Sequence, residues 1–591
     1  MSTGTVPYSW TPRFRKRDSL PTVQKTESPD GDRMGNGGQF LLVPSDTLED
    51  NMSVQESTDV VVVGFGPVGK LLAIKLGRAG HRVVVVDRQQ KGYPLPRAVT
   101  HDAEFARILQ SIGLPPTSIP EITQPYDDMY VWKNQSGETL LEVDWSGYGT
   151  SGWNNTYFFN QPDLEDRLDQ IVATLPNVQV RRGWLAIDHA DGLDAVSVTL
   201  RDEESQVQKV VTAQYLIGAD GATSKVRERM RGGWHDLGYF FDWLVVDVQP
   251  KPELQFPHVA TQTCDVARPC TMVPGGPGRR RWEFMLLPHE KAEDLNRTDR
   301  AWELLQPYGI NPENATLERH SVYTFHAGWA QQWRRGRVMI AGDAAHLMPP
   351  FAGQGLGAGV RDVMNLAWKL DAVLSGTASD TLLDTYGPER TAHVSAFIDF
   401  SMTLGKVICI TDPDEAAQRD ERMKADRAAG QQPPAPPNPT LGAGAHFSPN
   451  GGTLSRQYRV VAGAEPQAEP VRLDDLLGGP GVLLLRDEAM VDLISAAHRA
   501  QLTRAGVPVR GLVNQEASIR DEALLDTEQG YGKWLDELNV AAILIRPDFY
   551  LFDTADTAAD LDSLIERFGA TLAGTPLTGH RYGEHSMTVS S

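Results

Sequence analysis

The sequence predicts an α/β fold (α+β overall): a Rossmann-like nucleotide-binding domain, an antiparallel sheet interleaved with it, and a smaller C-terminal α/β domain. Three observations predict this fold. Residues 59–88 form a strand, a glycine-rich turn, a helix and a strand. Strand-like runs broken by Gly and Pro fill 233–330, and strand and helix patterns alternate over 474–569. The 591 residues suffice for several domains with their own cores.

Composition narrows the classes of partner. The formal net charge of −21 disfavours binding to nucleic acid or to anionic membranes, because the overall charge of the protein does not attract phosphate groups. The three cysteines form no CxxC and no metal-ligand pattern, so we expect neither a disulfide framework nor a metal site. The chain shows no apolar leader and no apolar run of membrane-spanning length, from which we expect a cytoplasmic protein.

The opening unit carries a nucleotide-binding pattern. Residues 60–63 are a continuous β-branched run, typical of a parallel strand buried on both faces. Gly64 permits a tight turn, Gly66 allows close approach of a pyrophosphate, and Gly69 lets the next helix pack on the strand. Asp87 ends the second strand, where it can accept a hydrogen bond from a ribose hydroxyl. The pattern predicts a dinucleotide site without saying which dinucleotide binds.

The middle of the chain alternates helical and strand-like patterns. Helical spacing predicts helices over about 103–112 and after the Asn-Gln-Pro at 160–162. Alternating runs over 178–216 predict antiparallel strands, and a strand, a glycine-rich loop and a long helix follow over 337–374.

Changes in composition predict the domain boundaries. The first segment is rich in Ser, Thr, Pro and Gly, and both Met34 and Met52 are compatible with a true start. The predicted segments are a disordered extension (1–56), the nucleotide-binding domain (57–410) with an interleaved, mostly sheet domain (about 160–215 and 233–330), a proline-rich linker (411–470) and the C-terminal domain (471–580).

Three motifs together resemble a known family. They are GFGPVG at 64–69 with Asp87, GADGATSKVR at 218–227, and GDAAHLMPPFAGQG at 342–355. In this order and spacing they resemble the single-component FAD-dependent aromatic hydroxylases, the para-hydroxybenzoate hydroxylase superfamily. The runs PRAV, NQP, WLVVDV, RRWEFML and NLAWKL are similar to the branch that contains 3-(3-hydroxyphenyl)propionate hydroxylases and polyketide hydroxylases.

The resemblance implies a non-covalent FAD site. Asp220 also has a purely structural alternative, in which it caps the turn after a strand. The family often has Met-Asn after GQG, where this chain has Leu356 and Gly357. The residues implied to contact FAD are Gly64, Gly66, Pro67, Gly69, Asp87, Arg88, Arg97, Gln161, Asp220, Asp343, Pro350, Gly353, Gly355, Leu356 and Gly357.

The resemblance also implies a reaction. NADPH or NADH reduces FAD, dioxygen forms a flavin hydroperoxide, and one oxygen is transferred to a phenolic or hydroxylated heteroaromatic ring. Three alternatives stay open: Baeyer–Villiger oxygenation or epoxidation of a polyketide-like substrate, a non-catalytic flavin-binding assembly partner, and a plain NAD-dependent dehydrogenase.

The base that ionises the phenol is not evident from the sequence. His101 and Tyr239 are candidates, each with packing as its alternative role. His346 lies in the third motif, and we expect it to be structural. The C-terminal domain resembles the thioredoxin-like appendage of the superfamily, but no cysteine follows Cys409. This excludes a dithiol role and leaves a structural role or the formation of a homodimer.

Overall fold

The computed structural model describes residues 56–92, 95–254, 256–438, 440–479, 481–513 and 520–575. The extension predicted over 1–56, with both start candidates, lies outside the described residues except for Glu56. The last residues of the domain predicted to end at 580 lie outside them as well.

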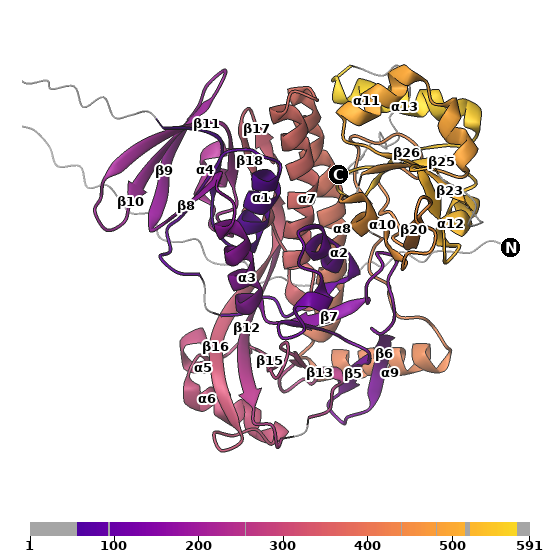
Figure 1. The fold of residues 1–591 in the computed structure, drawn as a ribbon. Helices are drawn as coiled ribbons and strands as arrows, with labels where there is room; N and C mark the ends of the chain where they lie inside the picture. Colours follow the sequence, from indigo (N-terminus) through magenta and orange to yellow (C-terminus); the bar gives the residue numbers. More distant parts are fainter. Residues whose placement is uncertain are drawn as a thin grey trace, which may run out of the picture. The chain divides into compact units, whose positions relative to one another are not determined.

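The first sheet contains the predicted strand, turn, helix and strand. Its eight strands have the order β17-β18-β11-β1-β2-β8, with a β9–β10 hairpin beside β11 (Figure 1). Strands β18, β11, β1, β2 and β8 pair in parallel, and the runs at 60–63 and 83–86 are buried. The bounds are β1 (Glu56–Val63), α1 (Pro67–Arg78), β2 (Val83–Asp87), β8 (Val178–Arg182), β9 (Trp184–Asp191), β10 (Val196–Asp202), β11 (Gln208–Gly218), β17 (Arg334–Arg335) and β18 (Val338–Ile340).

The assignment of 160–215 to the interleaved sheet is wrong. This stretch begins with helix α3 (Gln161–Ala173), and its strands β8 to β11 belong to the first sheet. Strand β11 pairs with β10 in antiparallel over its first half and with β1 in parallel over most of its length. Period-two alternation identifies strands, but it does not say which sheet they join.

The second sheet confirms the strands expected over 233–330. Its order is β19-β16-β12-β15-β14-β13-β5-β6, and the long strands β12 and β16 pair in antiparallel. Strands β5 and β6 come from an earlier part of the chain and close one edge. The bounds are β5 (Met129–Asn134), β6 (Thr139–Asp144), β12 (Trp234–Pro250), β13 (Ala260–Cys264), β14 (Cys270–Pro274), β15 (Arg280–Met285), β16 (Ala315–Ala330) and β19 (His346–Leu347).

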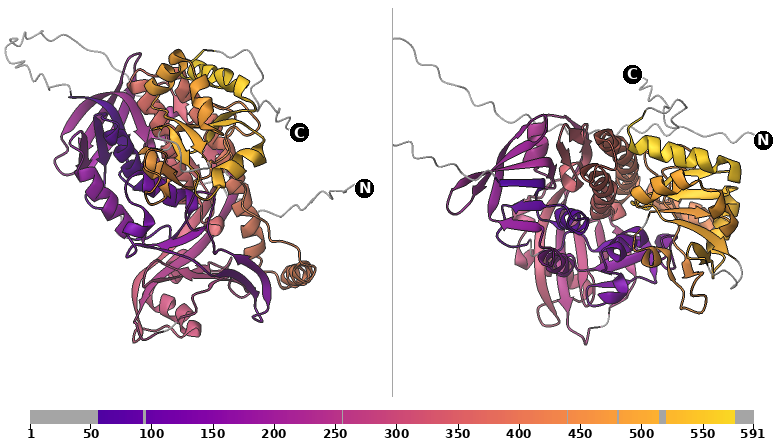
Figure 2. Two further views of the ribbon diagram at one scale, coloured as in Figure 1. Left: turned by 45° about the vertical axis from the view of Figure 1, so that its right-hand side comes forward. Right: turned by 45° about the horizontal axis from the view of Figure 1, so that its top comes forward.

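Two long helices, α7 (Gly355–Leu374) and α8 (Tyr386–Ile408), lie between the first sheet and the C-terminal domain in Figures 1 and 2. Helix α7 packs against α1 and α2 (Ala103–Ser111). Asp102 caps α2 by accepting a hydrogen bond from the Phe105 amide at 3.0 Å, and Gly113 follows the helix at φ +69°. The predicted α2 is thereby confirmed. Strands β3 (Thr100–Asp102), β7 (Thr156–Phe159) and β4 (Thr123–Pro125) form a small sheet beside it.

The predicted linker contains regular structure. Helix α9 (Pro413–Ala428) begins at the capping residue Asp412 and packs against β6, where Lys424 pairs with Glu138 at 3.1 Å. The linker prediction for 411–470 is therefore wrong for this part. The proline-rich run at 433–437 is typical of a linker, whereas the charged stretch before it has helical propensity.

The C-terminal domain is built on a seven-stranded sheet of order β21-β20-β24-β23-β22-β25-β26. Helices α10 (Leu473–Leu477), α11 (Ala496–Arg504), α12 (Gly530–Leu538) and α13 (Leu561–Leu572) accompany it. Its thioredoxin-like character stays a prediction. The strand bounds are β20 (Arg459–Ala462), β21 (Val471–Arg472), β22 (Val482–Leu485), β23 (Val509–Val513), β24 (Ala523–Leu525), β25 (Ala542–Ile545) and β26 (Leu551–Ala555).

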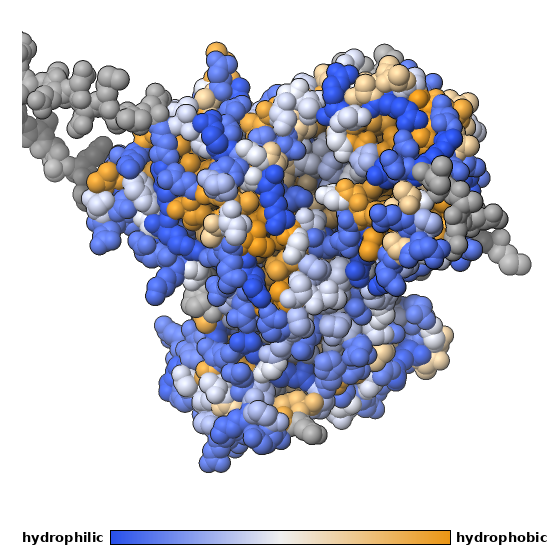
Figure 3. Space-filling view, viewed as in Figure 1, coloured by the Kyte–Doolittle hydropathy of each residue, from blue (hydrophilic) through white to orange (hydrophobic). Residues whose placement is uncertain are grey.

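The surface over β12, β16, α5 (Ala292–Leu295) and α6 (Thr298–Leu305) is mostly hydrophilic in Figure 3, as expected where antiparallel strands turn one face to solvent. No single helix in the described part of the chain is long and apolar enough to cross a membrane. One pair, Asp380–Ile408 with Pro413–Ala428, meets the criteria only when taken together, and it is bent by 113°.

Candidate functional site: a cavity between two helix N-termini

A cavity of about 840 Å³ is lined by both sheets and by the N-terminal ends of α1 and α7. Gly66, Pro67 and Val68 line it at α1, and Gly355 and Leu356 line it at α7. Neither helix has a side-chain cap or an acidic residue in its first turn. Two uncapped N-termini therefore face one cavity with their amide dipoles available to anionic or electron-rich groups.

The glycines at α1 each have a distinct structural reason. A Cβ at Gly64, which has φ +106°, would clash with the Ala219 carbonyl, and a Cβ at Gly69 would clash with the Gly64 carbonyl. Among the described residues, no atom lies within 4 Å of a Cβ built at Gly66. The first two glycines are required by the fold, whereas Gly66 leaves a cradle open above the helix end. This is the space that a pyrophosphate needs.

Asp87 holds the glycine-rich turn from the end of β2. Its Oδ2 accepts a hydrogen bond from the Phe65 amide at 2.7 Å, and its Oδ1 accepts one from the Gln89 amide at 2.7 Å. Arg88 is exposed, and neither residue lines the cavity. Ribose binding by Asp87 stays a prediction.

The second glycine-rich stretch forms the other end. Pro350 begins a 3-10 turn (Pro350–Ala352), and Gly353 follows at φ +64° before α7 starts. Pro350, Gly353, Gly355 and Leu356 all line the cavity. Gly357 does not: a Cβ there would lie 2.9 Å from Arg361 Nη1. A side chain at position 357 would therefore require Arg361 to move.

Two predicted FAD ligands have side chains that support loops. Gln161 Oε1 accepts hydrogen bonds from the amides of Arg97 (3.1 Å) and Ala98 (2.8 Å), so it holds the loop that lines the cavity. Asp220 accepts hydrogen bonds from Ser224 Oγ at 2.5 Å and from the Lys225 amide at 2.7 Å. These contacts match its structural alternative as a cap.

Arg97 and Asp343 both line the cavity, and Arg97 Nη1 lies 4.0 Å from Asp343 Oδ2. Both side chains are about half exposed, at 56% and 45%. They are therefore placed to contact a ligand that extends between the two helix ends.

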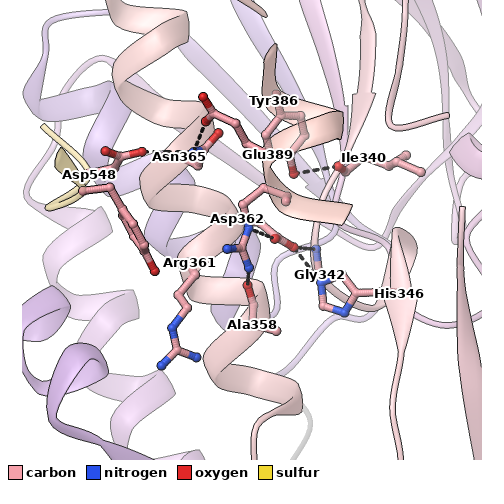
Figure 4. A network of polar contacts seen from close by, with 12 residues as sticks. Ile340, Gly342, His346, Ala358, Arg361, Asp362, Asn365, Tyr386, Glu389 and Asp548 are labelled. Carbon is pink, nitrogen blue, oxygen red and sulfur yellow. Dashed lines mark hydrogen bonds and ion pairs between the residues drawn. The ribbon is translucent and has the colours of Figure 1, made fainter. Parts of the chain in front are cut away.

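His346 is structural, as we expected. Its Nε2 lies 2.8 Å from Asp362 Oδ2, which also accepts a hydrogen bond from the Gly342 amide at 2.9 Å (Figure 4). Arg390 Nε donates to the other oxygen of Asp362 at 2.8 Å. This buried group joins α7 and α8 to the loop after β18.

His101 and Tyr239 lie in packed surroundings. His101 Nε2 lies 3.0 Å from Thr123 Oγ1, its Nδ1 lies 3.1 Å from the Asp102 carbonyl, and burial lowers its pKa to about 4. Tyr239 does not line the cavity; it packs beside Gly405 of α8, and burial raises its pKa. His101 also lines the cavity, although both of its ring nitrogens have partners within the protein. The catalytic roles of His101 and Tyr239 stay predictions.

The second sheet and α8 give the cavity an aromatic wall with a few polar groups. Gln262 Oε1 accepts hydrogen bonds from Thr271 Oγ1 at 2.6 Å and from Tyr130 Oη at 3.4 Å. Phe351 packs against Trp243 and Phe325 in T-shaped contacts. The aromatic residues that line the cavity are Tyr130, Trp132, Trp145, Phe158, Tyr323, Phe325, Phe351, Phe397 and Phe400.

A charged cluster that the sequence did not reveal lies on β12, β15 and β16. Asp247 accepts hydrogen bonds from Arg281 Nε (2.7 Å) and Nη2 (3.0 Å), and it lies 2.9 Å from Arg319 Nε. Glu283 Oε1 lies 3.7 Å from Arg281 Nη1. Arg281, Glu283 and Arg319 line the cavity.

Burial raises the pKa of the Glu283 carboxyl above its usual range, and Arg281 opposes that shift. The available sequence signal was the alternation in RRWEFM. Arg281 and Glu283 occupy one face of β15, and the core residues Trp282 and Phe284 occupy the other.

These residues fit FAD. The open cradle at Gly66, the two uncapped helix N-termini and the positive-φ turn at Gly353 face a single cavity, so the two ends of a dinucleotide can be held by backbone amides. The cavity continues to the aromatic wall, which suits a planar substrate.

Comparisons with known proteins agree with this fit. Residues 57–401 match the family described as FAD binding domain, and 452–571 match the HcaD C-terminal domain. A probable NADH-specific resorcinol 4-hydroxylase of Rhodococcus jostii (strain RHA1) is 36% identical over 526 residues, covering 88% of this chain and 96% of that relative.

Two further known proteins are similar to this chain. The 3-(3-hydroxy-phenyl)propionate/3-hydroxycinnamic acid hydroxylase of Escherichia coli (strain K12) is 37% identical over 358 residues, covering 60% of this chain and 63% of that relative. The crystal structure of the flavin-dependent monooxygenase PieE in complex with FAD and substrate is 21% identical, has a TM-score of 0.74, and matches 88% of this chain and 99% of that one. This last likeness shows the fold. The chain thus belongs to the FAD binding domain family and is an FAD-dependent aromatic hydroxylase.

Proposed function

We propose that this enzyme uses NADH to hydroxylate a small, uncharged phenol that carries a second ring hydroxyl. The observation that carries this proposal is Glu283, which lines an aromatic cavity beside arginines that are paired with Asp247. Resorcinol is such a phenol, and the Rhodococcus relative named for it supports both the substrate class and NADH as donor.

The chain's own residues bind the cofactor at its two ends. The amides of Gly66 and Val68 would hold the pyrophosphate, and those of residues 354–356 would lie against the electron-rich edge of the isoalloxazine ring, where the α7 dipole favours negative charge. When bound, FAD accepts two electrons from the pyridine nucleotide and activates dioxygen. Phe351 and the aromatic wall would exclude water from the site.

Glu283 is the proposed proton acceptor for the substrate. Its side chain is 14% exposed, so the carboxylate keeps accessible surface while most of it is shielded. A hydroxyl of the substrate that donates to Glu283 would become more phenolate-like, which increases electron density at the ortho and para ring carbons.

The same cluster disfavours an acidic substrate. Arg281 donates to both oxygens of Asp247 and to the carbonyls of Arg97 (2.7 Å) and Pro96 (2.6 Å). With Arg319 beside the same Asp247, two positive and two negative side chains balance in the cluster. A substrate carboxylate that approached Glu283 would meet a like charge at a poorly solvated site.

A substrate comparison tests the proposal. Purified enzyme with FAD and NADH is given resorcinol or 3-(3-hydroxyphenyl)propionate, and the products are identified by mass and by NMR. We expect a hydroxylated product from resorcinol and little from the acid. Oxidation of NADH without any hydroxylated resorcinol, or efficient turnover of the acid alone, would contradict the proposal. The homodimer stays a prediction, and sedimentation of the purified enzyme tests it.

A further inference from the structure

A hairpin of the C-terminal domain inserts its tip into the core of the FAD-binding region. The tip connects β25 to β26, and its residue Phe549 is fully buried in the apolar cluster that contains β1 and α7. The guanidinium carbon of Arg107, from α2, lies 4.3 Å from the centroid of the Phe549 ring. Phe549 has φ +73°, a strained conformation for a bulky residue, which persists only where the surroundings fix it.

The next residue along the tip makes a polar contact with α2. Tyr550 Oη donates a hydrogen bond to Glu104 Oε1 at 2.9 Å. Glu104 is 4% exposed, and its other oxygen, Oε2, accepts a hydrogen bond from Arg361 Nε at 2.5 Å. Arg361 also pairs with Asp102, so its guanidinium is held from two sides. One buried carboxylate thus connects the C-terminal domain to α7.

The chain of contacts ends in the cavity wall. Arg361 Nη1 donates a hydrogen bond to Gln354 Oε1 at 2.9 Å. Gln354 lies between Gly353 and the start of α7, and it lines the cavity. A Cβ at Gly357 would lie 2.9 Å from Arg361 Nη1 and 3.2 Å from Gln354 Oε1. Gly357, at a position where the family often has asparagine, therefore leaves room for the contact between Arg361 and Gln354.

We propose that Tyr550 is a positioning residue, through which the C-terminal domain holds the turn at 353–357 by way of Glu104, Arg361 and Gln354. The role of this turn at the isoalloxazine ring rests on the proposed function, but its restraint by Tyr550 does not. Burial raises the pKa of Tyr550, so its hydroxyl stays protonated and donates to Glu104. A domain without redox cysteines would then act on the flavin site by contact.

The test removes one hydroxyl from each of two buried tyrosines. Tyr550→Phe keeps the ring and deletes the donor to Glu104. Tyr531→Phe is the matched control, since Tyr531 Oη accepts from the Tyr458 amide at 3.1 Å within the C-terminal domain. Hydrogen–deuterium exchange of residues 350–358 is measured on the FAD-free full chain, and FAD affinity is measured by flavin fluorescence. Thermal unfolding of both variants is recorded alongside.

We expect faster exchange at 350–358 and FAD binding weaker by about threefold to tenfold in Tyr550→Phe, but not in Tyr531→Phe. Gln354→Ala removes the last contact to the turn, so it should raise exchange at 350–358 and leave exchange in the C-terminal domain unchanged. This variant replaces Tyr550→Phe as the test if Tyr550→Phe does not fold. Unchanged exchange at 350–358, or the same change in both tyrosine variants, would overturn the proposal. If the wild-type chain failed to bind FAD, the proposed function would fail, and the exchange result would still decide the role of Tyr550.

Discussion

The carboxylate of Glu283 lies 3.7 Å from the guanidinium of Arg281, measured from Oε1 to Nη1, yet Asp247 is the residue that holds this guanidinium by two hydrogen bonds. Of the two carboxylates near Arg281, that of Glu283 is therefore the one available to the cavity. This relationship makes Glu283 the residue on which the proposed proton transfer depends.

Glu283→Gln should lower kcat for resorcinol hydroxylation by about a hundredfold or more, since a positioned general base contributes that much. Glu283 must be deprotonated to accept a proton, so wild-type kcat should rise with pH, through an acidic limb above the usual carboxyl range because burial raises the pKa. The variant should lose that limb. Glu318→Gln on β16, whose partner Arg279 lies 3.1 Å away outside the cavity, is the control. A pH profile for Glu283→Gln equal to that of wild type would rule the role out.

Gly66→Ala should weaken FAD binding by about tenfold or more, because the added methyl group fills the cradle where the backbone would approach the pyrophosphate. It should leave the melting temperature of FAD-free protein unchanged, since nothing lies within 4 Å of the new Cβ. Gly92→Ala, where the described part of the chain likewise places no atom within 4 Å of the new Cβ, controls for the substitution itself. Fluorescence titration with FAD and thermal unfolding measure the two effects. Equal FAD affinities for the two variants would contradict the cradle.

His101→Phe should change the pH dependence of stability. The pKa of His101 is lowered from 6.5 to about 4 by burial, so between these values the unfolded chain binds more protons than the folded protein. The free energy of unfolding should therefore rise with pH through this window, by up to about 3 kcal/mol for this residue. Urea unfolding at several pH values measures it. The rise in the free energy of unfolding should be smaller in His101→Phe than in wild type. In His289→Phe, an exposed control, it should equal that of wild type.

Arg546→Met should destabilise the protein by about 3–5 kcal/mol, because it removes the cation that pairs with the buried Asp548 and leaves the buried Glu389 with Lys369 as its remaining cation. Arg546 is fully buried and contacts Glu389 of α8 at 2.8 Å and Asp548 at 2.5 Å, and Figure 4 shows both carboxylates beside Asn365 of α7. Arg297→Met, which breaks an exposed pair with Asp299, should change stability little. Denaturant unfolding measures the free energy of unfolding of both variants. Equal losses of stability in the two variants would contradict the prediction and would show that the contact between the domains is weak.

The sequence predicts the cofactor end of the site better than the substrate end. Gly64 and Gly69 were predictable because the tight turn leaves no room for a side chain there, and Gly66 was predictable because a pyrophosphate needs the open space at the helix end. The predicted contacts of Gln161 and Asp220 with FAD stay predictions. Their side chains accept hydrogen bonds from backbone amides, and these contacts depend on tertiary structure that the sequence does not reveal. Glu283 could not be predicted, because alternation along β15 does not reveal which face of the strand lines a cavity. Helix α9 could not be predicted because the proline-rich composition of the segment indicates a linker, although its charged residues have helical propensity.

The measurement that tests the central claim most directly is turnover of resorcinol with NADH under isotopically labelled dioxygen, followed by mass spectrometry of the product. A monooxygenase should place one labelled oxygen atom on the ring for each product molecule, and the purified protein should carry the absorption spectrum of a flavin. Product oxygen derived from water, or a protein that neither contains nor takes up FAD, would contradict the account.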